Sequence, residues 1–334
     1  MTIPCSISPI DSDCRLQIFK LQIVLLLSLA SATAGAYETD QFYKRLDPLE
    51  DATAVLDARV NETLATIVDE WQGPRDDWKF VNAIYRAIGG RHWVDRIERW
   101  AMDSPQVDRQ ETPRRASIYS GHPFWATRVI VFFGVGPTIK LNGQLIGSDK
   151  LGHFISQGRK YYRRYLRYQD EAEAAEHSAF TERAIFGQMT TGVYSNADLV
   201  ANFEGYRFYR SLFEPDIIPG KPALLRWEND HWVLQRPFTW SDHVNAYWDE
   251  ALNINHFDSL LYPYMESRLR CFCDDFGRAP ARYQVNNEEE LRERYSSLQL
   301  RDTSELRLDT LCANTTEKDH GSRETGGGEQ CGAY

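Results

Sequence analysis

Polar and small residues recur at helical spacing in two stretches of this chain. The offsets 0, 3, 4 and 7 hold Asp149, Gly152, His153 and Ser156 in the first stretch, and Asp198, Ala201, Asn202 and Gly205 in the second. On an α-helix these offsets fall on one stripe. Each stripe is preceded by a serine suited to cap a helix N-terminus, Ser148 and Ser195. We therefore predict two helices whose stripes face each other or a common third element.

The small residues of the stripes indicate close packing. Glycine costs a helix about 1 kcal/mol relative to alanine, and a solvated face has no need of Gly152 or Gly205. Without a side chain, these positions would let a neighbouring backbone approach. The polar residues beside them are then expected to be buried, and this buried polar cluster is the candidate functional site.

A third helix is predicted at about 178–190, where Glu182 is the polar member of a stripe at the same offsets. The three helices would bring carboxylates, an imidazole, an amide and an ammonium together. The predicted cluster consists of Asp149, Lys150, His153, Glu182, Asp198 and Asn202.

Three interpretations of this cluster are open, and the first is a divalent metal site. Its ligands would be Asp149, His153, Glu182 and Asp198. Helical bundles build metal sites from such inward residues, and this ligand set suits zinc, iron or manganese. The metal would activate water for hydrolysis. The nearby Lys150 and the lack of an HExxH or ExxH pattern count against a metal.

The second interpretation is a metal-free acid–base or phosphate-handling site. His153 would carry the proton, Asp198 would orient it and Lys150 would contact an anion. Asp149 and Asn202 complete this catalytic set. The third interpretation is structural, because a complete hydrogen-bonded ion network can fix how three helices cross.

The pattern elsewhere also predicts mainly helix. The charged and aromatic residues at 91–99 are expected to form a solvated, ion-paired helix face. The apolar run 129–133 is too short to span a bilayer. The other predicted elements are helices over 47–71 and 77–100, the latter broken at Gly89-Gly90, a loop over 102–117, a hairpin over 224–238 turning near Asn229-Asp230, and a helix from Ser241.

The predicted fold class is therefore mainly α: a helical bundle-like core with a small β-hairpin addition and a disordered C-terminal tail. The Pro-rich stretch that begins at Pro215 marks a boundary, and the chain becomes charged beyond about Asn286. The expected units are a signal peptide (1–36), a helical core carrying the cluster (37–214), a hairpin and helix extension (215–285) and a charged, partly disordered tail (286–334), with the disorder-like stretch at 315–330.

The N-terminus resembles a secretory signal peptide. Arg15 and Lys20 precede the apolar run 21–32, and small residues follow as far as Ala36. Cleavage after Ala36 would leave Tyr37 as the first residue. An uncleaved anchor is the alternative. The run is short for a stable membrane span, which needs about 20 apolar residues, so we expect an exported, periplasmic or secreted protein.

Cysteine usage agrees with export. Removal of the leader would leave an even number of cysteines, which in an exported chain favours disulfides. One or two bridges are expected to tie the C-terminal tail back, and their pairing is left open. These cysteines are Cys271, Cys273, Cys312 and Cys331.

Charge narrows the choice of partners. The net charge of −10 and the pI near 5.4 argue against a general nucleic-acid binder, which should be basic. One stretch, 159–168, nevertheless mixes cations with tyrosines, a combination that suits phosphate, lipid headgroups or a glycan. The acidic residues that follow offer neutralisation as the alternative. The candidate ligand contacts are Arg159, Lys160, Arg163 and Arg164.

The polar cluster resembles the VanZ-like superfamily and related exported DKxxHF proteins. The resemblance rests on Asp149-Lys150-x-x-His153-Phe154, then Glu182, then Ser195-x-x-Asp198-x-x-x-Asn202-x-x-Gly205, and it covers about 149–205. VanZ-like proteins are small helical membrane proteins tied to the cell envelope and glycopeptide resistance. The resemblance implies a helical core and an envelope role, although this chain is long and polar.

Two functions are expected on these grounds. The first is an envelope hydrolase, metal-assisted or histidine-based, that acts on a phosphate- or glycan-containing component. The second is a non-catalytic envelope binding or scaffold protein in which the cluster is structural. Partners would be an envelope lipid, glycan or protein, including peripheral contact with a membrane.

Overall fold

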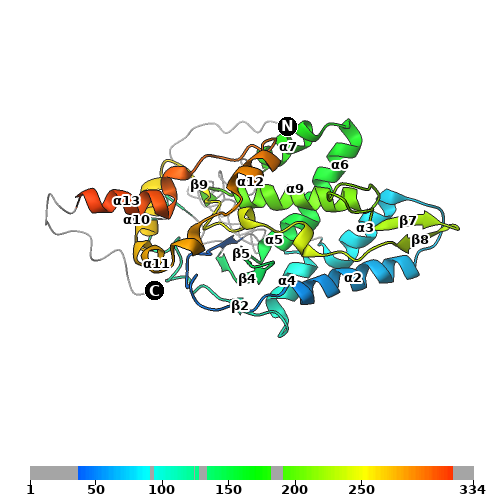
Figure 1. The fold of residues 1–334 in the computed structure, drawn as a ribbon, viewed down its shortest axis with the longest axis horizontal. Helices are drawn as coiled ribbons and strands as arrows, with labels where there is room; N and C mark the ends of the chain where they lie inside the picture. The colour runs from blue at the N-terminus through cyan, green and yellow to red at the C-terminus, as the bar shows by residue number, and fades with distance from the viewer. Residues whose placement is uncertain (1–36, 91–93, 124, 128–133, 182–190, 319–334) are drawn as a thin grey trace, which may run out of the picture.

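The structure, a computed structural model, describes residues 37–90, 94–123, 125–127, 134–181 and 191–318 (Figure 1). Helices dominate these ranges and the strands are short, which confirms the predicted mainly α fold class. The predicted position of Glu182 and the apolar run 129–133 lie outside the described residues. The α-helices are α2 (Thr53–Asp69), α3 (Asp77–Ile88), α4 (Arg96–Asp103), α5 (Asp149–Gly152), α6 (Gly158–Tyr168), α7 (Glu171–Thr181), α9 (Asn196–Ser211), α10 (Tyr262–Arg270), α11 (Cys273–Arg278), α12 (Glu288–Arg294) and α13 (Leu308–Lys318).

The helix α9 lies at the centre of the fold and is buried on nearly every side. Ser195 caps it as predicted, because its side chain accepts a hydrogen bond from the Asp198 backbone N–H at 3.1 Å. The helix α6 packs along α9 at a point where each helix has a glycine, Gly158 in α6 and Gly205 in α9. A Cβ at Gly158 would lie 2.6 Å from the Cα of Gly205, and a Cβ at Gly205 would overlap the Phe154 carbonyl. The predicted close approach of a neighbouring backbone is confirmed at Gly205, whereas Gly152 of the first stripe packs against the Glu98 side chain of α4.

The first stripe lies on a helix that changes its winding. Helix α5 passes directly into a π-helical segment, η2 (His153–Gln157), and then into α6. Such π segments are rare and are often found at functional sites. Ser148 precedes α5, but its side chain makes no capping hydrogen bond; its Oγ lies 3.1 Å from the Tyr37 hydroxyl instead. The predicted serine cap is therefore wrong for this helix and right for α9.

A small sheet that the sequence did not predict leads into α5. Its strands β2 (Arg109–Gln110), β4 (Thr138–Leu141) and β5 (Gln144–Gly147) are antiparallel. The turn between β4 and β5 is Asn142-Gly143, both with positive φ, as two-residue hairpin turns require. Beside it, β1 (Glu38–Thr39) pairs with β3 (Val135–Gly136) in parallel. The region expected to be a loop at 102–117 thus supplies a strand.

The predicted hairpin is confirmed. Strands β7 (Leu225–Glu228) and β8 (His231–Leu234) pair in antiparallel fashion, and the turn residues Asn229 and Asp230 have φ of 49° and 63°. The hairpin lies at one end of the molecule (Figure 1), where Trp232 packs against Phe80 with 5.4 Å between ring centroids. A second short pair joins β6 (Val193–Tyr194) and β9 (His256–Phe257).

Two predicted helices differ from the structure. The helix expected from Asp47 begins only at Thr53, because Ala52 donates its N–H to the Lys140 carbonyl and so joins β4. The helix expected from Ser241 is wrong: the chain forms two 3₁₀ turns, η4 (Trp240–Asp242) and η5 (Ala246–Trp248), separated by the extended backbone of Asn245. The predicted break between α3 and α4 is confirmed.

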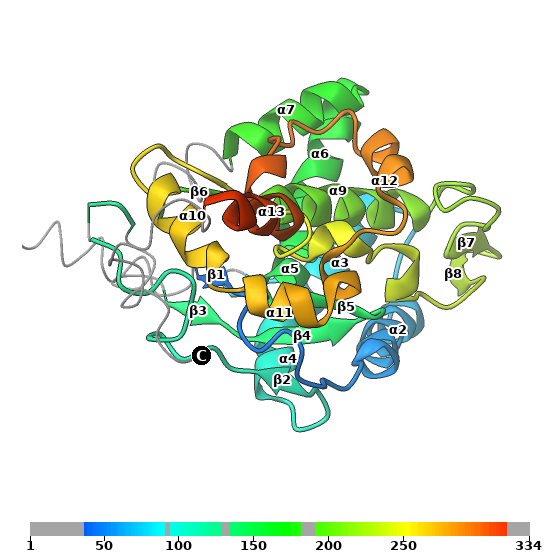
Figure 2. The same ribbon diagram turned by 60° about the vertical axis from the view of Figure 1, so that its left-hand side comes forward.

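One apolar core runs across the boundary expected at residue 215. Phe154 lies 4.7 Å from Trp240 between ring centroids, and both are fully buried. A second apolar cluster lies under α10, α11 and α13, at the end of the molecule away from the β7–β8 hairpin (Figures 1 and 2). The 3₁₀ turns η6 (Pro280–Tyr283) and η7 (Ser304–Leu306) complete the described elements.

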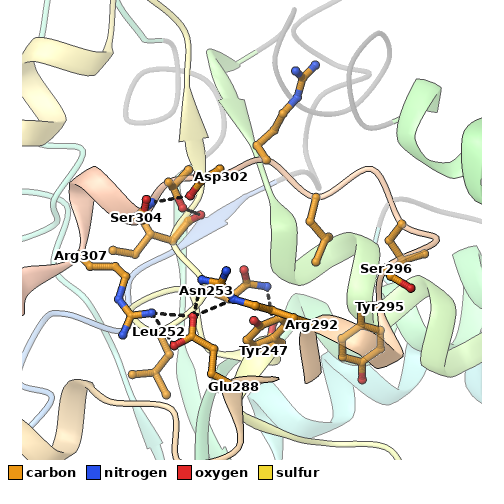
Figure 3. A pocket seen from close by; sticks show the side chains of 15 residues that line it. Tyr247, Leu252, Asn253, Glu288, Arg292, Tyr295, Ser296, Asp302, Ser304 and Arg307 are labelled. Carbon is orange, nitrogen blue, oxygen red and sulfur yellow. Dashed lines mark hydrogen bonds and ion pairs between the residues drawn. The ribbon is translucent and has the colours of Figure 1, made fainter. Parts of the chain in front are cut away.

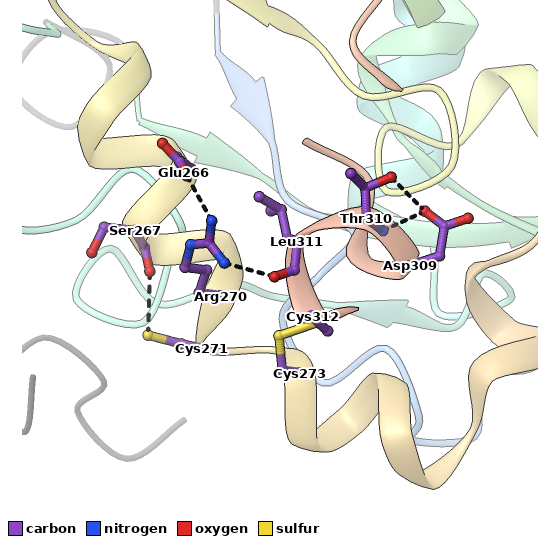
Figure 4. Close-up of a disulfide and its surroundings, with 9 residues drawn as sticks. All are labelled: Glu266, Ser267, Arg270, Cys271, Cys273, Asp309, Thr310, Leu311 and Cys312. Carbon is purple, nitrogen blue, oxygen red and sulfur yellow. Dashed lines mark hydrogen bonds and ion pairs between the residues drawn. A yellow bond between two sulfur atoms is a disulfide. The ribbon is translucent and has the colours of Figure 1, made fainter. Parts of the chain in front are cut away.

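The segment expected to be a tail is structured as far as Lys318. Helix α13 runs through 315–318, the start of the stretch expected to be disordered, and residues 319–334 lie outside the described part. Leu291 of α12 and Leu311 of α13 are buried, and a disulfide joins Cys273 to Cys312 (Figure 4). This bridge confirms the expectation that a disulfide ties the C-terminal segment back. Among the described helices, none is both long and apolar enough to cross a membrane.

Candidate functional site

Lys150 is the centre of the polar cluster. Its ammonium Nζ lies 2.8 Å from Oδ2 of Asp149, 2.7 Å from Oδ1 of Asp198 and 2.7 Å from Oε1 of Glu250. The lysine is 1% exposed. A buried charge is costly unless it is paired, and here one ammonium is paired with three carboxylates.

The carboxylates come from three separate parts of the fold. Asp149 begins α5, Asp198 lies in the first turn of α9, and Glu250 follows η5 in an irregular segment. Ser195 links two of these parts, because its Oγ donates to Glu250 Oε1 at 3.1 Å while it accepts from the Asp198 N–H. The cap of α9 therefore also fixes the cluster.

His153 connects the cluster to the surface. Its Nε2 lies 3.1 Å from Oδ2 of Asp198, and its Nδ1 lies 3.0 Å from Oδ1 of Asn202. The amide of Asn202 donates in turn to Ser178 Oγ at 3.2 Å. The His153 side chain is 20% exposed, which makes it the most exposed member of the cluster.

Burial and pairing act in opposite directions on the charges. Burial alone would lower the pKa of Lys150. The negative charges of the three carboxylates have the larger effect, so this pKa lies well above its usual value. Burial likewise would raise the pKa of Asp198, but His153 and Lys150 outweigh it and the pKa is lowered. Burial prevails at Asp149, whose pKa is raised, and at Glu250, whose pKa rises to about 7.

A second layer of buried acids surrounds these residues. Glu98 accepts a hydrogen bond from the Tyr37 hydroxyl, and burial raises the pKa of Glu98 to about 8. Asp95 accepts from Ser156, and burial raises its pKa to about 6. Both acids lie on or next to α4, in the stretch expected to be a solvated face, yet they are only 3% and 4% exposed. The expectation is wrong for these two acids, because α4 turns its acidic side towards Gly152 of α5, and it is confirmed for Arg96 and Arg99, which are exposed.

Glu38 of β1 belongs to the same layer. Burial raises its pKa to about 8, and the charges of Glu250 and Asp198 add to the effect. The neighbouring Thr39 donates its hydroxyl to Glu250 Oε2 at 3.3 Å. The strand β1 therefore closes the side of the cluster formed by Glu250.

The sequence-predicted residues fall into two groups. Asp149, Lys150, His153, Asp198 and Asn202 come together as predicted. Glu182 lies outside the described residues. Sequence reasoning did not find Glu38, Asp95, Glu98 and Glu250, nor the part played by Ser195.

The donor atoms of the cluster suit a metal ion, but the Lys150 ammonium at their centre does not. Asp149, His153 and Asp198 each offer a ligand atom within 4.8 Å of the others, a spacing suited to one ion. Lys150 Nζ, however, is ion-paired with both of these aspartates. A divalent ion would have to displace or repel this ammonium, so the geometry favours the metal-free interpretations.

Two arginines of the predicted basic surface on α6 already interact with other side chains of the protein. The Arg159 guanidinium lies 4.8 Å from the ring centre of Trp78 and 4.5 Å from that of Tyr85. Arg164 pairs with Glu173 at 2.6 Å. Lys160 and Arg163 are exposed.

In chemical terms, the cluster offers a histidine–aspartate pair that solvent can reach, with a buried lysine that fixes the aspartate. General acid–base catalysis uses such a pair. Comparison with family models, curated proteins and solved structures found no match to this chain.

Proposed function

We propose that this chain is an exported protein of the cell envelope whose polar cluster is a hydrolytic acid–base site. His153 is the proton carrier, Asp198 orients its ring, and Lys150 holds Asp198 in place. The observation that carries this proposal is the position of His153, 20% exposed and bound to a buried aspartate at 3.1 Å. A general base must come within hydrogen-bond reach of its substrate, and His153 is the member of the network best placed to do so.

The two ring nitrogens have different roles in this proposal. Asp198 holds Nε2 as an N–H donor, so Nδ1 exchanges the proton with substrate or water. Oδ1 of Asn202 now lies 3.0 Å from Nδ1, and because an amide oxygen only accepts, this hydrogen bond forms when Nδ1 carries the proton. A substrate hydroxyl or a water molecule would take its place there, and Asn202 would hold that group instead.

The substrate class follows from charge near the site. Lys160 and Arg163 are exposed on the helix that continues from His153. An anionic group is the ligand that such a pair favours. We therefore propose a phosphate- or glycan-containing envelope component as substrate.

The proposed location is the periplasm or the exterior of the cell, reached by a leader cleaved after Ala36. The Cys273–Cys312 disulfide supports this location, because disulfides form and persist in oxidising compartments. The VanZ-like resemblance supports the envelope, and it remains a prediction.

A second candidate function is a non-catalytic scaffold. It is favoured by the pairing within the network: both nitrogens of His153 have partners, and Lys150 is paired with three carboxylates. Such a buried polar network can specify helix packing. In that case α6 would be the contact surface for an envelope partner.

The test is hydrolysis by residues 37–334, purified without chelator. The substrates are bis(4-nitrophenyl) phosphate and 4-nitrophenyl glycosides, each assayed for wild type and His153→Gln. We expect the variant to fold and to lose about 100-fold or more of the rate, the scale of a general base. His231→Gln, an exposed histidine on β8, is the matched control and should keep the full rate.

Two results would decide against the acid–base site. Undiminished hydrolysis by folded His153→Gln would remove His153 from the reaction. Stoichiometric metal in wild type by elemental mass spectrometry, absent from His153→Gln, would replace it with the metal-assisted alternative. If instead His153→Gln and Asp198→Asn both fail to fold, the scaffold becomes the better account.

A further inference from the structure

A pocket of about 320 Å³ lies outside the polar cluster, between α12 and the loop after η5 (Figure 3). The chain from 296 to 304 forms its far wall. Volumes of this size accommodate small organic molecules. The pocket and the cluster are separate, but they share a neighbour: Asn196, the first residue of α9, donates to the backbone carbonyls of Ile254 and Arg301 in the pocket wall at 3.0 and 2.9 Å.

The charged lining of the pocket is mostly basic. Three arginines and two carboxylates line it, in a chain whose net charge is −10. The lining therefore carries a small excess of positive charge in a molecule that is acidic as a whole, and positive charge in a pocket favours the binding of anions. These charged residues are Arg292, Arg301, Arg307, Glu288 and Asp302.

Glu288 holds two of the arginines in place. Arg292 donates to Glu288 Oε1 through NH2 at 2.8 Å, and Arg307 donates through NH1 to both carboxylate oxygens at 2.8 and 2.9 Å (Figure 3). A guanidinium has five N–H donors, so this carboxylate orients the two groups without using all their donors. Two fixed guanidinium groups on one carboxylate are a preorganised site for a second oxyanion.

The remaining walls are aromatic and aliphatic. Tyr247 and Tyr295 stack with 5.9 Å between centroids and an angle of 28°. Leu252, Ile254 and Leu298 line the pocket beside them. A ligand that fits both parts carries one oxyanion and a compact apolar or aromatic body.

We propose that this pocket binds a small organic anion, a carboxylate or a phosphate monoester, whose oxyanion is held by Arg292 and Arg307 and whose apolar part packs against the Tyr247 side of the pocket. The Arg292 side chain is 64% exposed. An incoming anion can therefore reach the guanidinium donors of Arg292 that Glu288 leaves unused. The proposal does not depend on the activity of the His153 cluster.

The experiment is isothermal titration calorimetry at low salt with the purified protein. The probes are phenyl phosphate and benzoate, which separate the two oxyanions, and benzyl alcohol, which has the same ring without the charge. We expect one anionic probe to bind at one site and benzyl alcohol not to bind. Arg292→Gln should weaken binding by about tenfold.

The control is Arg226→Gln, which removes an arginine of similar exposure from the β7–β8 hairpin and should leave binding unchanged. Binding of neither anion by wild type would overturn the proposal. Equal affinity in wild type and Arg292→Gln, or equal weakening in Arg226→Gln, would also overturn it, because either result would place the anion elsewhere. A thermal melt of each variant confirms that it is folded.

Discussion

The Lys150 ammonium lies 2.7 Å from the Glu250 carboxylate, across a separation of 100 residues in the chain. This contact joins the helix that carries His153 to the irregular segment after η5. It also places a third carboxylate on a lysine that Asp149 and Asp198 already hold. The stability of the fold is therefore expected to depend on this lysine.

Removal of the ammonium is the most direct test. Lys150→Met should destabilise the protein by about 3–5 kcal/mol at pH 7.5, because buried carboxylates lose their counter-charge. The loss should shrink at pH 5.5, where Glu250, with its pKa of about 7, is protonated. Urea denaturation at both pH values measures it, with Lys44→Met, an exposed lysine, as the control. Equal midpoints for wild type and Lys150→Met at pH 7.5 would contradict the network.

The raised pKa values predict that stability falls as the pH rises. Glu98 and Glu38 titrate at about 8 in the folded protein, above their usual value of 4.5, so the native state binds more protons between these limits. The contribution of these two groups to the free energy of unfolding is then fully present below about pH 4.5 and is lost as the pH rises to about 8. Each such group contributes a slope of about 1.4 kcal/mol per pH unit.

Glu98→Gln isolates one of these groups. The amide keeps a hydrogen-bonding side chain next to Tyr37 but does not ionise. The variant should be more stable than wild type at pH 8 and comparable at pH 5, as followed by urea denaturation across this range. Glu293→Gln, an exposed glutamate of α12, is the control. A pH dependence of Glu98→Gln parallel to that of wild type would show that Glu98 does not titrate in this window.

The approach of α9 to the His153 helix predicts a large effect of a single methyl group. Gly205→Ala should cost about 3 kcal/mol, because the new Cβ would overlap the Phe154 carbonyl and force the helices apart. Gly277→Ala in α11 is the matched control, since a Cβ there meets nothing within 4 Å. The control should be stabilised by about 0.5–1 kcal/mol. Equal midpoints for the two variants in thermal unfolding would contradict the close packing.

The Cys273–Cys312 bridge closes a loop of 39 residues. Replacement of both cysteines by serine should cost about 3–4 kcal/mol by the loop-entropy relation. In hydrogen exchange, the backbone amides of α11 and α13, which the bridge joins, should lose protection first, while those of α9 keep theirs. Equal protection of α13 in both proteins would show that packing alone holds this helix.

The sequence was informative where a residue's role is local. The Ser195 cap predicted the start of α9, and the 3.6-residue period placed Asp149 with His153 on one stripe and Asp198 with Asn202 on the other, because each signal depends on neighbours along one helix. The Asn229-Asp230 turn was likewise predicted from local chemistry. The Asn142-Gly143 pair is the same kind of local signal, and it is typical of the two-residue turn that joins β4 to β5.

The rest of the site could not be predicted in this way. Glu250 lies in a segment without periodicity, and nothing in its neighbourhood indicates a partner 100 residues away. Asp95 and Glu98 occur among cations, a pattern typical of a solvated face, and only the packing of α4 against Gly152 shows that they are buried. Tertiary contact, rather than propensity, determines these positions.

The burial of β1 has a consequence for the order of maturation. Thr39, Asp40 and Gln41 are almost completely inaccessible in the folded protein, and β1 is paired with β3 beside Glu250. Peptidases cut exposed, extended chain. If the proposed leader is removed after Ala36, the peptidase must therefore act while residues 37–41 are still outside the fold. Processing would come first, and only the released chain could insert β1 and complete the native cluster.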